Sequence, residues 1–73
     1  MAAHQIQKGD TFFKMDSQSY WVVQELLHFP AVPMHVRLVE RGGNQRTVTL
    51  AARELLDRRK YELKAAATTD GRS

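Results

Sequence analysis

The longest run of strand-forming residues is YWVVQELLH, at residues 20–28. Its first half alternates, which places Trp21 and Val23 on the same face of a strand. The alternation then fails at Gln24 and Glu25, and two adjacent leucines follow. One extra residue in a strand, a β-bulge, produces such a slip together with a bend. We therefore predict one long strand that bends near its middle.

Three further segments are rich in strand formers, namely residues 11–15, 34–41 and 45–50. The last two segments are joined by residues 42–44, Gly-Gly-Asn, which tolerate the positive φ of a hairpin turn. Alternation predicts that the inward positions of this hairpin are Val36, Leu38, Val48 and Leu50. The buried aromatic residues are predicted to be Phe12 and Trp21, with either Phe13 or Tyr20 on the surface.

The periodicity changes after residue 50, where residues 51–57 have a short helical pattern. A helix of about two turns is not stable alone, so Leu55 or Leu56 must pack against the strands. Residues 61–63 then predict a short last strand. We expect residues 1–8 to be loose, and residues 64–73, which include no large apolar side chain, to be a disordered tail.

Four strands, one helical turn and a fifth strand, over residues 9–63, resemble the SH3-like barrels, which include Tudor and KOW domains. The resemblance rests on the Gly9-Asp10 opening, the bend after Trp21 and the helical turn. It implies a mostly β fold, a strongly bent five-stranded barrel. The patterns Trp-x-Val, Pro-x-His-Val-Arg-Leu and Leu-Leu-Asp-Arg-Arg-x-Tyr also resemble short uncharacterised bacterial proteins. Because such barrels serve many partners, the fold does not identify the function.

Length and composition favour one small cytoplasmic domain. The chain has 73 residues and no cysteine, which fits a reducing compartment. No apolar run is long enough to span a membrane, and the first residues lack the basic and apolar regions of a secretion signal.

No residue pattern indicates catalysis or a bound metal. Ser17 and Ser19 lie in a predicted turn, outside any nucleophile motif. His28 and His35 flank a loop, but two imidazoles without a thiolate make a weak metal site. No phosphate-binding loop is present. We predict a non-enzymatic binding module without a cofactor or metal.

Positive charge gathers in the second half of the chain, where residues 37–64 carry eight cationic and four anionic side chains. Because the guanidinium group suits phosphate, we expect weak binding of RNA, or of a ribonucleoprotein, through a basic face. Its expected residues are Arg37, Arg41 and Arg46 in a stripe on the sheet, and Arg53, Arg58, Arg59 and Lys60 around the helical turn. In the alternative interpretation, local acidic residues neutralise these cations, for example in a Glu54–Arg58 pair.

A second hypothesis concerns the loop FPAVP at residues 29–33. An aromatic residue beside a rigid proline segment loses little entropy on binding. Phe29, Pro30 and Pro33 would then contact a partner protein, and the domain would be an interaction adaptor. The other interpretation of Phe29 is that it caps the open end of the barrel.

Overall fold

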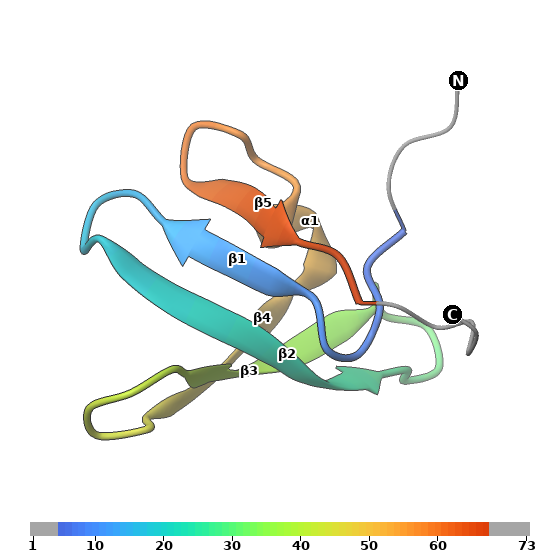
Figure 1. Ribbon diagram of the computed structural model, residues 1–73. Coiled ribbons are helices and arrows are strands. Elements are labelled where there is room, and N and C mark those ends of the chain that lie inside the picture. The colour runs from blue at the N-terminus through green and yellow to red at the C-terminus, as the bar shows by residue number, and fades with distance from the viewer. Residues whose placement is uncertain (1–4, 68–73) are drawn as a thin grey trace.

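The protein is mostly β, with five antiparallel strands and one short helical turn before the last strand (Figure 1). The computed structural model describes residues 5–67. Along the chain the elements are β1 (Thr11–Lys14), β2 (Ser19–Leu27), β3 (His35–Glu40), β4 (Thr47–Ala51), α1 (Ala52–Leu55) and β5 (Tyr61–Ala65). Across the sheet the strands lie in the order β4-β3-β2-β1-β5.

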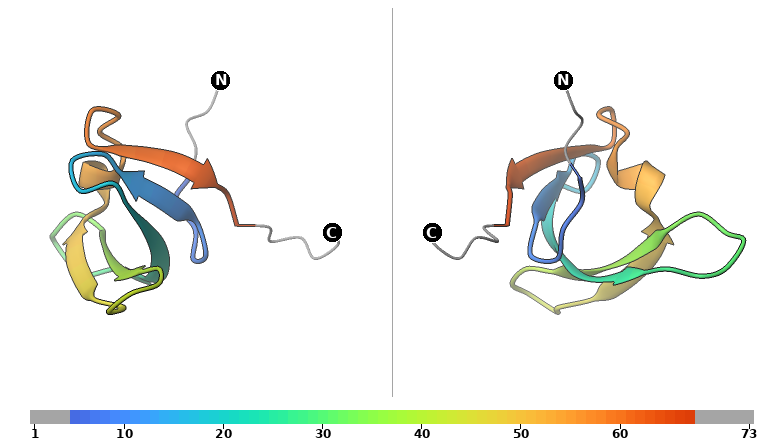
Figure 2. Two further views of the ribbon diagram at one scale, coloured as in Figure 1. Left: turned by 60° about the vertical axis from the view of Figure 1, so that its left-hand side comes forward. Right: turned by 90° about the vertical axis from the view of Figure 1, so that its right-hand side faces the viewer.

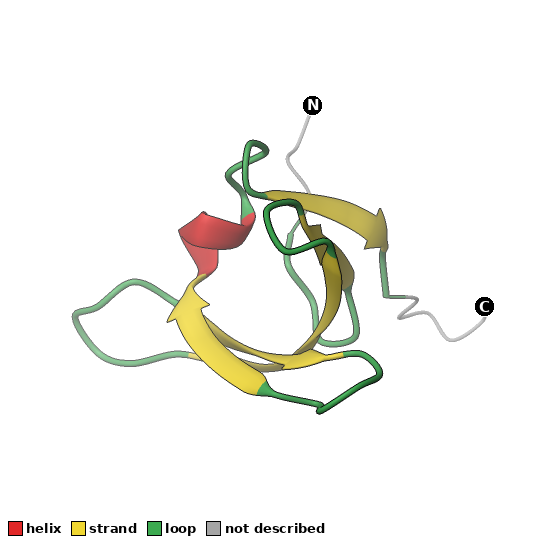
Figure 3. Ribbon diagram, turned by 90° about the vertical axis from the view of Figure 1, so that its left-hand side faces the viewer, coloured by secondary structure: helices red, strands yellow, loops and turns green. Residues whose placement is uncertain are grey.

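The long strand β2 bends where the sequence predicts it. Val23 pairs with Leu38 and Glu25 pairs with Arg37, so Gln24 is an extra, unpaired residue. This bulge helps the sheet to curl, as Figure 2 shows from two sides. The strands β4 and β5 are the two edges of the sheet and do not pair with each other, so the curl stays open. The helix α1 lies at that opening (Figure 3).

The β3–β4 hairpin confirms the predicted turn, because Gly42 and Gly43 have φ angles of 70° and 54°. One predicted inward residue of this hairpin differs from expectation. Val48 pairs with the buried Leu38 and shares its face of the sheet, yet it is 38% exposed. The physical reason is that β4 is an edge strand, so its side chains have a covered neighbour on one side only.

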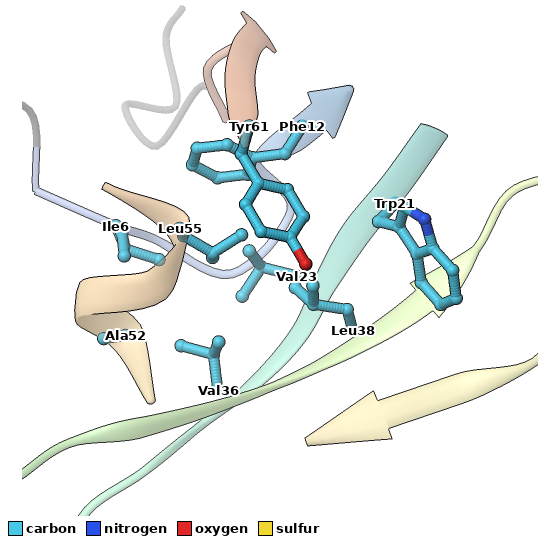
Figure 4. Close-up of a cluster of buried hydrophobic side chains, with 9 residues drawn as sticks. All are labelled: Ile6, Phe12, Trp21, Val23, Val36, Leu38, Ala52, Leu55 and Tyr61. Atoms are coloured by element: carbon cyan, nitrogen blue, oxygen red, sulfur yellow. The ribbon is translucent and has the colours of Figure 1, made fainter. Parts of the chain in front are cut away.

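The core confirms most of the predicted inward residues. Phe12 and Trp21 are buried, and Val36 and Leu38 are fully buried. Figure 4 shows them among nine side chains that converge from the sheet, from α1 and from the segment before β1. The helix is shorter than predicted. Of the two adjacent leucines, Leu55 packs into this core together with Ala52, whereas Leu56 is 52% exposed.

Both flanks of the predicted domain make contacts with it. Ile6 lies in the core although residues 1–8 were expected to be loose, and β5 continues to Ala65. The carboxylate of Asp10 is fully buried and accepts hydrogen bonds from the backbone N–H groups of Gln7, at 2.9 Å, and Ala67, at 2.6 Å. The sequence does not predict these contacts, because a single apolar residue, Ile6, and a backbone hydrogen bond, from Ala67, produce no periodic pattern. The rest of the two predicted flexible ends, residues 1–4 and 68–73, lies outside the described residues.

Candidate nucleic-acid interface

Two pairs of aromatic residues lie on adjacent rungs of the β1–β2 hairpin. Phe12 pairs with Trp21, and Phe13 pairs with Tyr20. Neighbouring residues of a strand face opposite sides of the sheet, so the first pair faces the core and the second faces solvent. Tyr20 is 42% exposed and Phe13 is half-buried, which confirms that one of these two residues lies on the surface. Their ring centroids are 5.0 Å apart, with 57° between the ring planes.

A cation lies beside each ring of the solvent-facing pair. The Nζ atom of Lys64, on β5, is 5.7 Å from the centroid of the Phe13 ring and 3.4 Å from Oε1 of Glu62. The guanidinium carbon of Arg41 is 5.6 Å from the centroid of the Tyr20 ring. The Arg41 backbone N–H also donates to the Tyr20 carbonyl, at 2.9 Å. This hydrogen bond holds Arg41 next to Tyr20 on the neighbouring strand. We call these four residues, Phe13, Tyr20, Arg41 and Lys64, the aromatic platform.

The platform lies next to a small apolar floor on the same face. One rung further along the sheet, Val22 pairs with Val39, and both side chains are half-buried. The following rung holds Glu25 opposite Arg37, joined by an ion pair of 3.0 Å. The outer face therefore changes from aromatic and cationic, through apolar, to charge-balanced.

Most of the cations predicted to bind nucleic acid are in ion pairs. Four of the seven contact a carboxylate: Arg37 with Glu25 at 3.0 Å, Arg46 with Glu40 at 2.9 Å, Arg59 with Asp57 at 3.2 Å, and Lys60 with Glu54 at 2.8 Å. The hydrogen bond from Arg59 lowers the pKa of Asp57, and the one to Glu54 raises the pKa of Lys60. The expected Glu54–Arg58 pair is not among the contacts, because α1 ends at Leu55 and residue 58 is outside the helix.

The three arginines of the predicted stripe do not share one face. The Glu40 N–H donates to the Arg46 carbonyl at 2.7 Å, so these residues are cross-strand neighbours. Opposed residues share a face, and Glu40 lies two residues after the buried Leu38. Arg46 therefore projects from the inner face at the end of the hairpin. Arg37 and Arg41 stay on the outer face.

Three of the predicted cations are in no ion pair within residues 5–67, namely Arg41, Arg53 and Arg58. Arg41 belongs to the platform, whereas Arg53 and Arg58 are exposed at α1 and the turn that follows it. Arg58 lies at an open cleft of about 660 Å³, together with apolar residues that include the exposed Leu56 and Met15.

The residues of the adaptor hypothesis lie elsewhere. Phe29 is 52% exposed, and its ring makes an edge contact with His35, at 6.3 Å between centroids. Pro30 and Pro33 are exposed, and the Pro33 carbonyl lies 2.8 Å from Nδ1 of His35. This loop follows the far end of β2 from Tyr20, so it is separate from the platform.

Phe13, Tyr20 and Lys64 were not expected to act together. The sequence holds a signal for the first two, because the aromatic pairs at 12–13 and 20–21 flank a short turn. If residue 12 pairs with residue 21, the other two rings must meet on the opposite face. Lys64 has no such signal, since its place depends on the irregular pairing of β5 with β1.

Within residues 5–67, no group of three or more histidine, aspartate and glutamate side chains is placed to hold a metal ion. The same residues include no helix with the length and hydropathy of a membrane span. No protein-family model matches the chain, and no curated protein or solved structure does either.

Proposed function

We propose that this protein is a small, non-enzymatic module that binds single-stranded nucleic acid, chiefly RNA, through the aromatic platform. The observation that carries the proposal is a solvent-facing aromatic pair, with Tyr20 exposed and Phe13 half-buried, and a cation beside each ring. Bases stack on aromatic side chains whatever their identity, which contributes about 1–3 kcal/mol per base. Arg41 and Lys64 would meet the phosphates on either side of a stacked base.

Arg41 has a double role in this proposal. In the free protein its guanidinium lies near the Tyr20 ring, within cation–π distance. An incoming base takes the place of the guanidinium on the ring, and Arg41 then reaches the adjoining phosphate. Few phosphate contacts fit on such a small surface, so we expect affinity on the order of micromolar at physiological salt, with little sequence discrimination.

The ion pairs make the platform a better candidate than the whole basic half of the chain. A cation that already contacts a carboxylate must give up that contact to neutralise a phosphate. Arg37, Arg46, Arg59 and Lys60 are in this position, and so is Lys64 of the platform, which contacts Glu62 at 3.4 Å. Arg41 is in no such pair among the described residues, so it is the main phosphate contact of the platform. Arg53 and Arg58 remain as secondary phosphate contacts.

We also propose that the curled sheet is an opened SH3-like barrel. The order of elements, the bulge in β2 and the single helical turn before β5 support this assignment. The proposed setting is the cytoplasm, which the absence of cysteine favours.

The test is a titration of fluorescently labelled single-stranded RNA at two salt concentrations. The double variant Arg41→Glu with Lys64→Glu should bind at least tenfold more weakly than the wild type. The matched control, Lys8→Glu with Lys14→Glu, changes the net charge equally but at residues outside the platform, and should lose less than about threefold. Circular dichroism checks that each variant is folded. Absence of binding at low salt, or equal losses in the two double variants, would overturn the proposal.

The exposed ring of Phe29 supports a second candidate function, a protein-interaction adaptor. In that case a partner protein should be recovered with the tagged chain after nuclease treatment. Phe29→Ala should abolish the recovery, and Tyr20→Ala should leave it unchanged. Equal recovery with folded Phe29→Ala protein would remove this candidate.

A further inference from the structure

The strand β4 is an edge strand without the usual protection. It pairs with β3 on one side only, and its sequence, TVTLA, has no charge and no proline. Its pairing with β3 has no bulge, and Thr47, Val48 and Thr49 are exposed. Edge strands normally include charges, prolines or bulges that prevent pairing with other chains. The other edge strand, β5, follows that rule with Glu62 and Lys64.

The hydrogen bonds of the β3–β4 hairpin show which backbone groups of β4 face outward. The Glu40 N–H donates to the Arg46 carbonyl at 2.7 Å, and the Ala52 N–H donates to the Met34 carbonyl at 2.9 Å. Hydrogen-bonded pairs alternate along an antiparallel ladder, so the even-numbered residues of β4 bond to β3. The N–H and C=O groups of Thr47 and Thr49 and the N–H of Ala51 therefore point to the open side, which we call the β4 edge. The Ala51 carbonyl, at the N-cap of α1, accepts the first hydrogen bond of the helix.

We propose that two copies of this chain associate through the β4 edge, as antiparallel strands related by a twofold axis at Thr49. In this register Thr49 lies opposite Thr49 of the second copy, and Thr47 lies opposite Ala51. Every outward N–H of these three residues then has an acceptor, because they occupy the hydrogen-bonded positions of the new ladder. The Ala51 carbonyl accepts from α1 with one lone pair and has a second for the Thr47 N–H of the other copy.

The same register brings apolar side chains together. Val48 lies opposite Leu50 of the second copy, on the inner face of both sheets. Val48 is 38% exposed and Leu50 is half-buried, so pairing covers apolar surface that the single chain leaves open. An open cleft of about 480 Å³ borders Leu50, which leaves room beside the strand on that face.

A second copy is the partner that the sequence of β4 favours. One register satisfies the outward backbone groups and matches Val48 with Leu50, which makes the strand complementary to itself. Because TVTLA is uncharged, two copies bring no like charges face to face within the strand. A closed twofold pair also uses both β4 edges, so the association stops at the dimer. The platform takes no part in this contact.

Cysteine substitutions test both the association and its register, because the natural chain has no cysteine. In Thr49→Cys the two thiols lie directly opposite each other, with Cα atoms about 5.5 Å apart, within the range of a disulfide. Thr47→Cys is the matched control, an exposed threonine of the same strand and face. Two copies of residue 47 are more than about 13 Å apart in this register, beyond disulfide reach.

Under mild oxidation we expect a covalent dimer of Thr49→Cys and at least tenfold less of Thr47→Cys. Sedimentation of the wild type should show a reversible dimer. Thr49→Lys, which sets two ammonium groups opposite each other, should shift it to monomer, whereas Thr49→Ser should not. A wild type that stays monomeric at millimolar concentration, equal crosslinking at 47 and 49, a dimer that persists in Thr49→Lys, or oligomers that grow beyond two would each overturn the proposal.

Discussion

The two aromatic rungs of the β1–β2 hairpin have similar side chains and opposite surroundings. Phe12 and Trp21 are enclosed by the core, whereas Phe13 and Tyr20, one position away on each strand, have no layer above them. Aromatic content alone therefore does not distinguish a structural residue from a surface for binding. The position of each residue in the alternation, together with what covers that face, makes the distinction.

The largest expected difference between the two rungs is in stability. Trp21→Ala should lower the free energy of unfolding by about 3–5 kcal/mol, as for other large aromatic deletions in cores. It also removes the hydrogen bond from Trp21 Nε1 to Ser19 Oγ, at 2.8 Å. Tyr20→Ala should cost less than about 1 kcal/mol, because its ring is already half in solvent. Urea denaturation followed by circular dichroism measures both values, and equal costs would contradict the assignment of faces.

The two aspartates that flank β1 offer a second comparison between buried and exposed positions. Asp10→Ala leaves the N–H groups of Gln7 and Ala67 without their acceptor in a buried site. We expect a loss of about 2–4 kcal/mol in the free energy of unfolding. Asp16 forms an exposed pair with Lys14, so Asp16→Ala should change stability by less than about 0.5 kcal/mol. Denaturation curves that rank the two variants in the opposite order would show that the Asp10 contacts are unimportant.

The third expected effect is on binding by the outer rung. Tyr20→Ala should weaken binding of single-stranded RNA by about fivefold to 150-fold, the equivalent of one lost stacking contact. Tyr20→Phe keeps the ring and should bind nearly as well as the wild type. The same fluorescence titration measures both variants. If Tyr20→Phe loses as much affinity as Tyr20→Ala, stacking is not the source of the binding.

The smallest expected effect concerns Tyr61, an aromatic residue of the inner face. Burial disfavours the phenolate and raises the pKa of Tyr61 above its usual 10.0. The unfolded chain then loses this proton at lower pH than the folded chain, so stability falls as the pH rises above about 10. Melting temperatures at pH 9 and pH 11 should differ less in Tyr61→Phe than in the wild type. An equal or larger difference in Tyr61→Phe would place the hydroxyl in water.

The sequence predicts the strands well where one face is covered throughout. Alternation identifies Trp21, Val23, Val36 and Leu38 because each lies on a strand that is paired on both sides. It cannot decide between Leu55 and Leu56, since both follow the same short helical pattern and only the docking of α1 separates them. It also misjudges Val48, because local sequence does not show that β4 would be an edge.

The candidate site depends on information that lies beyond any single strand. The turn at 42–44 sets which residues of β3 and β4 pair, and this register puts Arg46 and Arg37 on opposite faces. A shift of the register by one residue would put both arginines on the same face. The approach of Lys64 to Phe13 depends on how β5 pairs with β1 across an irregularity. The charge count of the second half was correct, but the ion pairs that balance much of it follow from tertiary placement.

The bulge at Gln24 has a consequence for how this sequence can change during evolution. Before the bulge, odd-numbered residues of β2 face the core, and after it the inward residue is Leu26, an even-numbered one. A deletion of one residue there would restore strict alternation and keep Trp21, Val23 and Leu26 on the core face, but it would remove the bulge and the bend that the bulge gives to β2. A relative of this chain with one residue fewer between Trp21 and Leu26 should therefore keep the same core face but have a straighter β2 and a less curled sheet. The exposed loop at residues 28–33 should accept insertions more readily, because it lies outside the strand pairing.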